Sequence, residues 1–139
     1  MKYLCLIFCV CASQAVRAGD LKLEIKGSGL TGKTIYAAVY TTAQAQDFPM
    51  RDQNARGGNV IATGDIVEIL MQNFADGEYA VAVYEDINGN GKLDTNFLGI
   101  PKEPVGTSRD AKGNFGPPKF ANAAFKIGDG ITPISIQLH

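Results

Sequence analysis

Short apolar segments separated by turn residues recur along the chain and constrain it to a β fold. In residues 21–26, three aliphatic side chains alternate with three charged ones, as a half-buried strand requires. Further strand-like segments lie at residues 34–40, 59–63, 65–72, 78–84, 121–127 and 131–138. No segment has the periodicity of a long amphipathic helix. The sequence therefore predicts an all-β fold, a seven-stranded antiparallel sandwich of immunoglobulin-like or transthyretin-like type. An eight-stranded closed barrel is the alternative, although few strands are visible for closure.

The pattern also predicts details of this sandwich. Val67, Ile69 and Met71 are expected to point inward, and Pro133 belongs near a sheet edge because it lacks an N–H group. The Gly77-Glu78-Tyr79 segment is similar to the tyrosine corner of Greek-key sandwiches, in which the phenol bonds to backbone near the preceding turn. Ala75 stands where that motif often has an acid.

Residues 1–18 have the features of a cleaved secretory signal. A lysine precedes an apolar run, and Val16-Arg17-Ala18 places small side chains before the expected cut. The run is too short for a membrane span, and Val10 before Cys11 disfavours lipid attachment. All three cysteines lie in this segment, which removes disulfides from residues 19–139. We expect one domain at 19–139, secreted or periplasmic, with no membrane span.

The charge balance argues against nucleic acid as a partner. The whole chain has a formal net charge of −1, and loss of Lys2 and Arg17 with the signal makes it about −3. Neither this balance nor any basic run favours nucleic acid or an anionic membrane surface. The expected partner is an unidentified envelope or extracellular molecule.

Residues 86–120 form the longest segment without a strand or helix pattern. They contain six glycines and four prolines, together with apolar residues that would need burial. A loop of this length in a compact domain is usually functional or disordered, and its apolar content favours order. We therefore expect one long ordered loop that carries the function.

The beginning of this loop has the spacing of a calcium ligand set. Oxygen-bearing side chains occupy its first, third, fifth and ninth positions, and Gly91 permits a sharp bend. The predicted ligands are Asp86, Asn88, Asn90 and Asp94, with the carbonyl of Lys92. Further acids that could complete the shell are Glu85, Glu103 and Asp110. The twelfth position departs from the helix-loop-helix calcium motif, because Phe97 replaces its bidentate glutamate. The alternative is that Asn88-Gly89 and Asn90-Gly91 simply form tight turns.

Two resemblances involve this segment. The run DINGNGKLDTNFLGIPKEPVG, followed by SRDAKGNFGPPKF and Ala-Ala-Phe, resembles a bacterial family of small secreted proteins known as a domain of unknown function, number 2141. Membership implies an exported β-sandwich and no assigned activity. The family pattern implies tyrosine at Val105 and two asparagines near Arg109-Asp110, so this chain departs from the pattern at these positions of the loop. The nine-residue acidic run alone is also similar to calcium loops in the B repeats of staphylococcal surface adhesins, which rigidify immunoglobulin-like modules.

Apolar residues later in the loop are candidates for a ligand or partner surface. They are Phe97, Ile100, Phe115 and Phe120. The alternative is a satellite core beneath the loop. The cations Lys102, Arg109, Lys112 and Lys119 could hold an anion, although scattered solvated charges are the default interpretation.

Catalysis has little support in the sequence. The single histidine is the terminal His139, and the three serines after the signal lack a nucleophile motif. A carboxylate pair from Glu85, Asp86, Asp94 and Glu103 could serve a small hydrolase, but the chain has little room for a sugar cleft. We therefore expect a non-catalytic binding module with a structural calcium ion. A structural or assembly component of the envelope is the alternative.

Overall fold

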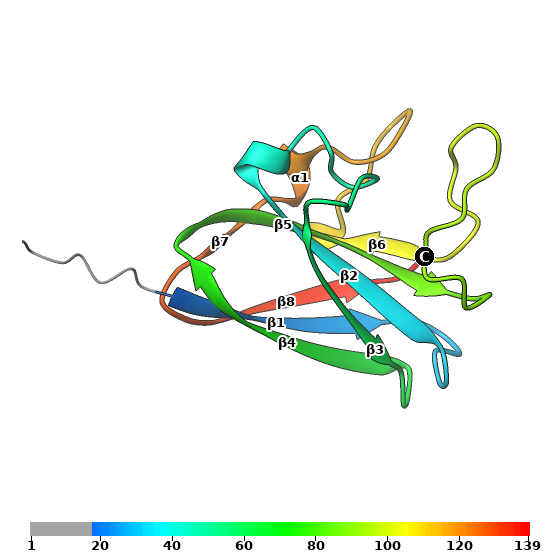
Figure 1. The fold of residues 1–139 in the computed structure, drawn as a ribbon, viewed down its shortest axis with the longest axis horizontal. Helices are drawn as coiled ribbons and strands as arrows, with labels where there is room; N and C mark the ends of the chain where they lie inside the picture. Colours follow the sequence, from blue (N-terminus) through cyan, green and yellow to red (C-terminus); the bar gives the residue numbers. More distant parts are fainter. Residues whose placement is uncertain (1–17) are drawn as a thin grey trace, which may run out of the picture.

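The computed structural model describes residues 18–139 as two packed β-sheets (Figure 1). The predicted signal, apart from Ala18, lies outside the described residues. One sheet has the order β4 (Ile66–Ala75), β1 (Ala18–Lys26), β8 (Gly130–Gln137). The other has the order β3 (Arg56–Ile61), β2 (Thr34–Thr41), β5 (Gly77–Asp86), β6 (Val105–Thr107), and β7 (Phe125–Ile127) also pairs with β5. The all-β sandwich is confirmed.

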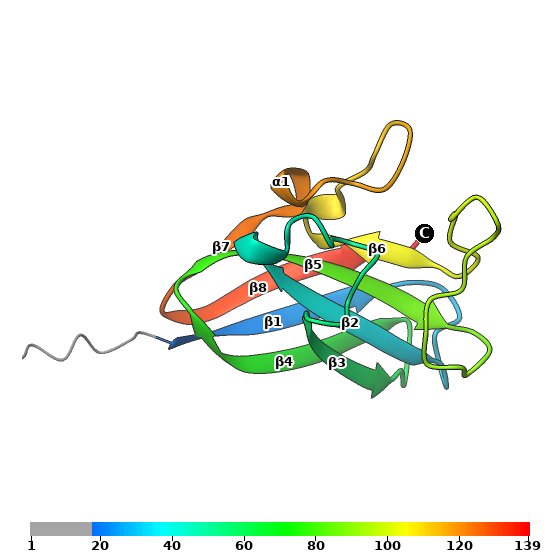
Figure 2. The ribbon, with the colours of Figure 1, turned by 45° about the horizontal axis from the view of Figure 1, so that its top comes forward.

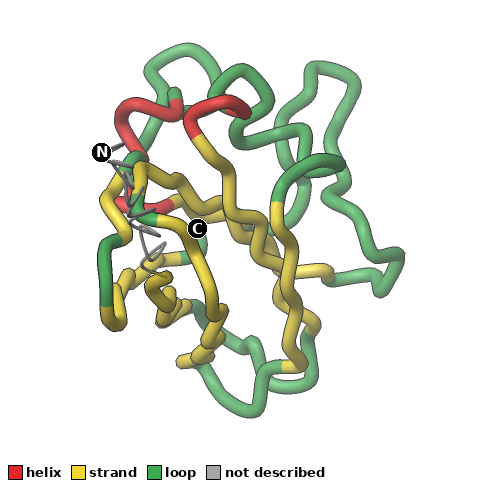
Figure 3. Tube along the Cα trace, turned by 60° about the vertical axis from the view of Figure 1, so that its left-hand side comes forward, coloured by secondary structure: helices red, strands yellow, loops and turns green. Residues whose placement is uncertain are grey.

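Three short helices complete the described part of the chain. They are η1 (Thr42–Gln44), η2 (Ser108–Asp110) and α1 (Phe120–Ala123). No helix within residues 18–139 has the length and apolarity that crossing a membrane requires. The turned view in Figure 2 and the trace in Figure 3 show long loops rising on the side of the molecule where these helices lie.

The core between the sheets follows from the alternation in the sequence. Leu21, Leu23 and Ile25 are fully buried, and they pack in one cluster with side chains of β2 and β5. Val67 and Met71 are buried there as predicted, and Ile69 packs at the margin. Lys22, Glu24 and Lys26 alternate with the β1 core residues and lie on the outer side of the sheet, where Lys22 pairs with Glu68. Burial of this apolar face is the main stabilising contribution to the sandwich.

Three features of the strands differ from the prediction. There are eight strands, because the three-residue β6 lies inside the predicted loop. The β1–β8 pair is parallel, whereas the other strand pairs are antiparallel. Residues 121–127 are not one strand. Residues Phe120–Ala123 form the helix α1, and β7 follows it. The helix places Phe120 and Ala123, three positions apart, in a second apolar cluster, described below.

The tyrosine corner is confirmed. The Tyr79 hydroxyl donates a hydrogen bond of 2.8 Å to the carbonyl of Ala75, at the junction between β4 and β5. The Tyr79 ring packs edge-on against Phe74, which is buried at the same corner. Pro133 lies on β8, which ends the sheet order β4-β1-β8, so its position near an edge is also confirmed.

A second apolar cluster covers part of the outer face of the β5 sheet. Tyr40, Phe48 and Phe120 pack with edge-to-face rings over Ala80 and Ala123. Phe120 is only 7% exposed. It therefore belongs to the interior, and the expectation that it contributes to a surface is wrong.

The two sheets meet where β6 passes the end of β8. Val105 and His139 exchange backbone hydrogen bonds of 3.2 and 3.0 Å, which link the C-terminal end of the chain to β6. A Cβ atom added to Gly106 would lie 2.6 Å from the carbonyl oxygen of Gln137 and 2.7 Å from a methyl group of Ile136. Glycine is therefore required for this close approach.

We predict that Gly106→Ala destabilises the domain by about 1–3 kcal/mol, because backbone atoms must shift to accept the methyl group. Denaturant unfolding of residues 18–139, which contain every described strand, measures the change. Gly64→Ala is the matched control, since a Cβ atom there meets nothing within 4 Å. Equal stability of the two variants would show that the β6–β8 contact is not tight.

Candidate functional site

Asp86 ends β5 and organises the turn that follows it. Its carboxylate accepts backbone hydrogen bonds from Gly89 at 2.8 Å and Asn90 at 3.2 Å through Oδ1, and from Gly91 at 2.8 Å through Oδ2. Gly89 and Gly91 both have a positive φ angle of 75°, which glycine adopts without strain. Asp86 is 4% exposed. The amides compensate for its burial and hold residues 86–91 in a tight coil.

The other predicted side-chain ligands lie around the same turn. The side-chain amides of Asn88 and Asn90 both donate to Oδ2 of Asp94, the second at 2.9 Å. Their amide oxygens accept backbone hydrogen bonds of 3.1 Å from Asn90 and Lys92, respectively. Asn90 therefore connects the two carboxylates, since its backbone binds Asp86 and its side chain binds Asp94. The structure brings all four predicted side chains into one network.

Glu103 fastens the two ends of this turn. Its Oε1 accepts the Ile87 amide at 2.9 Å, and its Oε2 accepts the Asp94 amide at 3.1 Å. A backbone bond of 2.8 Å from Lys102 to the Asp94 carbonyl lies beside it. Glu103 is buried, so these bonds form where water competes poorly. Of the three additional acids, Glu103 contacts the turn directly, through these two hydrogen bonds.

The other two additional acids lie elsewhere. Glu85 is buried and pairs across the sheet with the core residue Ile35, so strand alternation places its side chain on the face opposite to Asp86. Asp110 accepts the Gln137 amide at 3.2 Å, which ties η2 to β8. Asp110 and its neighbour Arg109 both have positive φ angles, of 47° and 59°. Asparagine tolerates this region better than most residues, which gives a physical reason for the pair of asparagines implied by the family resemblance.

Two stacked tyrosines form a wall beside the turn. The rings of Tyr36 and Tyr84, direct cross-strand partners, lie 5.1 Å apart and nearly parallel. A Cβ atom at Gly91 would lie 3.5 Å from the Tyr36 hydroxyl, so the turn packs against this pair. Burial raises the pKa of the Tyr84 phenol, and the neighbouring Tyr36 and the negative charges of Asp52, Asp86 and Glu103 raise it further. The sequence alone did not predict this stacked pair, because the strand register is needed to show that the two tyrosines are neighbours.

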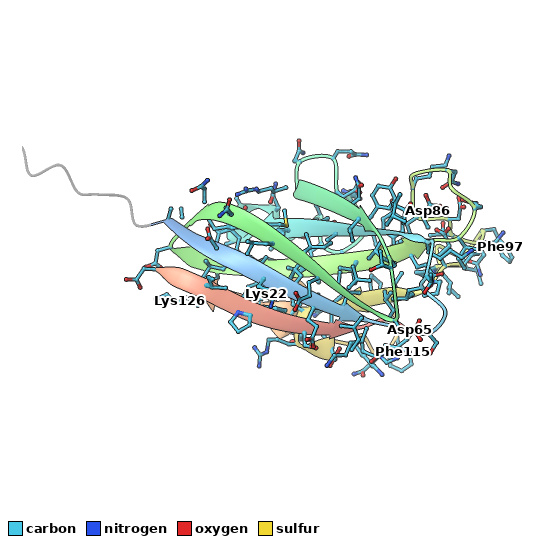
Figure 4. All side chains as sticks on the ribbon, turned by 90° about the horizontal axis from the view of Figure 1, so that it is seen from below. Lys22, Asp65, Asp86, Phe97, Phe115 and Lys126 are labelled. Atoms are coloured by element: carbon cyan, nitrogen blue, oxygen red, sulfur yellow. The ribbon has the colours of Figure 1, made fainter. Side chains whose placement is uncertain are left out.

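Beyond the turn, the apolar candidates are displayed rather than buried. Phe97 is 95% exposed, Phe115 is fully exposed, and Ile100 is exposed. These three do not form a satellite core. Phe97 and Phe115 lie toward the same end of the molecule as Asp86, opposite to Lys126 (Figure 4).

The donor chemistry of the turn fits a hard cation. A carboxylate has about four lone-pair sites, and the amides of Gly89, Asn90 and Gly91 use three on Asp86. Each asparagine amide oxygen keeps a second lone pair, and Oδ1 of Asp94 accepts no hydrogen bond from a described residue. Within residues 18–139 no three His, Cys, Asp or Glu side chains are grouped as a metal site. Coordination here would therefore depend on amide and carbonyl oxygens as well as carboxylates, as calcium allows.

The fold and the site define a class: a small β-sandwich with an Asp/Asn-rich turn at the end of a central strand. Residues 24–135 match the model of the family described as "Uncharacterized protein conserved in bacteria (DUF2141)". This match covers most of the chain, so the protein belongs to that family. The matched residues include the turn, Glu103 and both tyrosines. Comparison with curated proteins and with solved structures gave no match.

We predict that Glu103→Ala destabilises the domain by about 2 kcal/mol, because the Ile87 and Asp94 amides lose a charged acceptor. Amide hydrogen exchange at these two residues should accelerate more than exchange in the β1 core. Glu78→Ala, at an exposed position on β5, is the control. Unchanged exchange at Ile87 and Asp94 would contradict the fastening role of Glu103.

We also predict a stability loss at alkaline pH that depends on Tyr84. A phenol whose pKa is raised on folding contributes stability fully below the ordinary value of 10.0, and this contribution is lost as the pH rises above it. The melting temperature should therefore fall less steeply above pH 10 in Tyr84→Phe, which keeps the stacked ring. Parallel pH profiles for the two proteins would contradict the burial of this phenol.

Proposed function

We propose that the protein is a non-catalytic exported binding module whose turn at residues 86–94 binds a structural calcium ion. The ion orders the longer loop, residues 86–120, which faces a ligand or partner. Asp86, Asn88, Asn90 and Asp94 would supply side-chain oxygens, and Lys92 would supply its carbonyl. The observation that carries this proposal is the single hydrogen-bonded network of these four side chains at the base of the loop.

The electrostatics of the turn support a cation. The carboxylates of Asp86, Asp94 and Glu103 lie around the same turn, and a short chain of hydrogen bonds connects them. Glu103 binds the Asp94 amide, so a cation at Asp94 would also lower the repulsion between these groups. A bound divalent ion supplies positive charge and additional rigidity. With only two carboxylates among the ligands themselves, we expect a dissociation constant on the order of 10⁻⁴–10⁻³ M, in the range of extracellular calcium modules.

The same hydrogen bonds support a structural role over a catalytic one. Asp86 and Glu103 accept backbone amides through both of their oxygens, so they act as braces for the chain. Ser108 is fully buried, donates to the Ala123 carbonyl at 2.6 Å and accepts the Val81 amide at 2.9 Å. Its hydroxyl therefore joins η2 to β5 and α1. These groups are positioned by packing rather than presented to a substrate.

We predict that calcium raises the melting temperature of residues 18–139. At 100 times its dissociation constant the ion should stabilise the domain by about 2.7 kcal/mol, which corresponds to several degrees. Asp94→Asn keeps an acceptor for the asparagine amides but removes a charge, so it should lose most of the shift.

Two controls make this experiment specific. Asp76→Asn removes an exposed carboxylate on another turn, whose nearest cation is Lys126 at 3.9 Å, and should keep the full shift. Magnesium at the same concentration separates calcium coordination from general ionic strength, because Mg²⁺ requires a smaller octahedral site. No calcium shift, or an equal shift in Asp94→Asn, would overturn the proposal.

A further inference from the structure

Two turns in the long loop carry nearly isolated apolar side chains. We call residues 95–101 the first turn and residues 112–118 the second turn. The first turn exposes Phe97, Leu98 and Ile100, and the second exposes Phe115. Phe97 and Phe115 have essentially the exposure of free side chains, so no part of the described structure covers them. Single exposed apolar side chains are common on protein surfaces, so the case for a contact depends on their placement and on the charges around them.

Both turns are built to hold these side chains away from the body. In the first turn, the Asn96 side chain accepts the Leu98 and Ile100 amides at 2.9 and 3.0 Å, and Thr95 bridges to Pro101. In the second turn, a Cβ atom at Gly113 would lie 1.9 Å from the Gly116 carbonyl oxygen. The backbone therefore closes tightly below Phe115. Hydrogen bonds in the first turn and close backbone packing in the second shape both turns in the unbound structure, and a preformed turn loses less entropy on docking.

The two turns lie on one side of the molecule and toward one end of it (Figures 1 and 4). The first turn (yellow-green) and the second turn (orange) rise on the same side of the molecule in Figures 1 and 2. The view from below places the labelled Phe97 and Phe115 toward the same end (Figure 4). A contact made by two separated points differs from the continuous patch that a protein interface normally buries.

Lysines flank both tips. Lys92 and Lys102 lie on either side of the first turn, Lys112 begins the second turn, and Lys119 follows it. All four are exposed, and none forms an ion pair with another described residue. On the outer sheet face, by contrast, Lys22 pairs with Glu68 and Lys26 pairs with Glu24. Lysines without an ion-pair partner therefore lie next to both apolar tips in the sequence, and Lys33 and Arg109 also form no ion pair with a described residue.

We propose that the two turns dock on the surface of an anionic lipid bilayer, with Phe97 and Phe115 inserted among the lipids and the four lysines at the headgroups. A bilayer accepts isolated apolar points without matching pockets, and lysines near it are attracted by anionic lipids. The docking geometry stands independently of the metal. Its regulation rests on the proposed function, because calcium at residues 86–94 would offset the carboxylates at the base of the first turn and strengthen docking.

Vesicle binding of residues 18–139 tests this proposal. With vesicles containing phosphatidylglycerol and phosphatidylcholine, Phe97→Ser and Phe115→Ser should each weaken partitioning by about tenfold, and both together should abolish it. Binding should fall with added salt and be weak to phosphatidylcholine alone. Ile131→Ser is the matched control, since it removes an exposed apolar side chain from β8 on the other sheet and should leave binding unchanged.

The outcomes separate docking from calcium binding. Vesicle binding that is equal in calcium and in chelator supports docking and overturns its regulation by the metal. A calcium-induced thermal shift without any vesicle binding leaves the proposed function in place and overturns docking. Equal losses in Ile131→Ser and Phe97→Ser overturn docking as well. If the protein does not bind vesicles but forms concentration-dependent dimers that disappear in Phe97→Ser, docking is overturned and the tips contact a second copy of the chain instead.

Discussion

The carboxylate of Asp86 is the group on which the structure of the turn after β5 depends. It stands at the last position of the central strand β5 and receives three backbone amides from the residues that follow. Without this acceptor, the Gly89 and Gly91 amides would lose their hydrogen-bond partner at a partly buried strand end, a costly arrangement. β5 therefore gives the loop a rigid starting point, and the Asp86 carboxylate fixes the conformation of the residues that follow it.

Beyond Asp86, three further side chains hold successive parts of the loop. Glu103 binds the amides at both ends of the turn at residues 87–94, and Asn96 closes the first apolar turn. Ser108 binds β5 and α1, before and after the second apolar turn. Each fastening uses a side-chain oxygen to satisfy or replace backbone pairing that a β ladder would otherwise provide. A long segment can thus be ordered with little secondary structure of its own. The loop is therefore ordered at its base, and its tips expose apolar side chains.

The sequence predicted the sandwich, its inward residues and the tyrosine corner, because these depend on local alternation and on one short motif. It located the oxygen-rich turn for the same reason, since Asp86, Asn88, Asn90 and Asp94 are close in the chain. The features that it missed depend on distant pairing. The parallel β1–β8 contact joins the two ends of the described chain, and Tyr36 meets Tyr84 only through strand register. Phe120 and Phe115 have the same chemical character, and only tertiary packing decides that one is buried and the other exposed.

The most direct test of the account is a crystal structure of residues 18–139 grown in millimolar calcium, with the ion identified by anomalous scattering. The account predicts one cation about 2.3–2.6 Å from side-chain oxygens of Asp86, Asn88, Asn90 and Asp94 and from the Lys92 carbonyl. Asp94 would then accept fewer hydrogen bonds from the asparagine amides. An unchanged hydrogen-bonded turn, with no ion at saturating calcium, would contradict it.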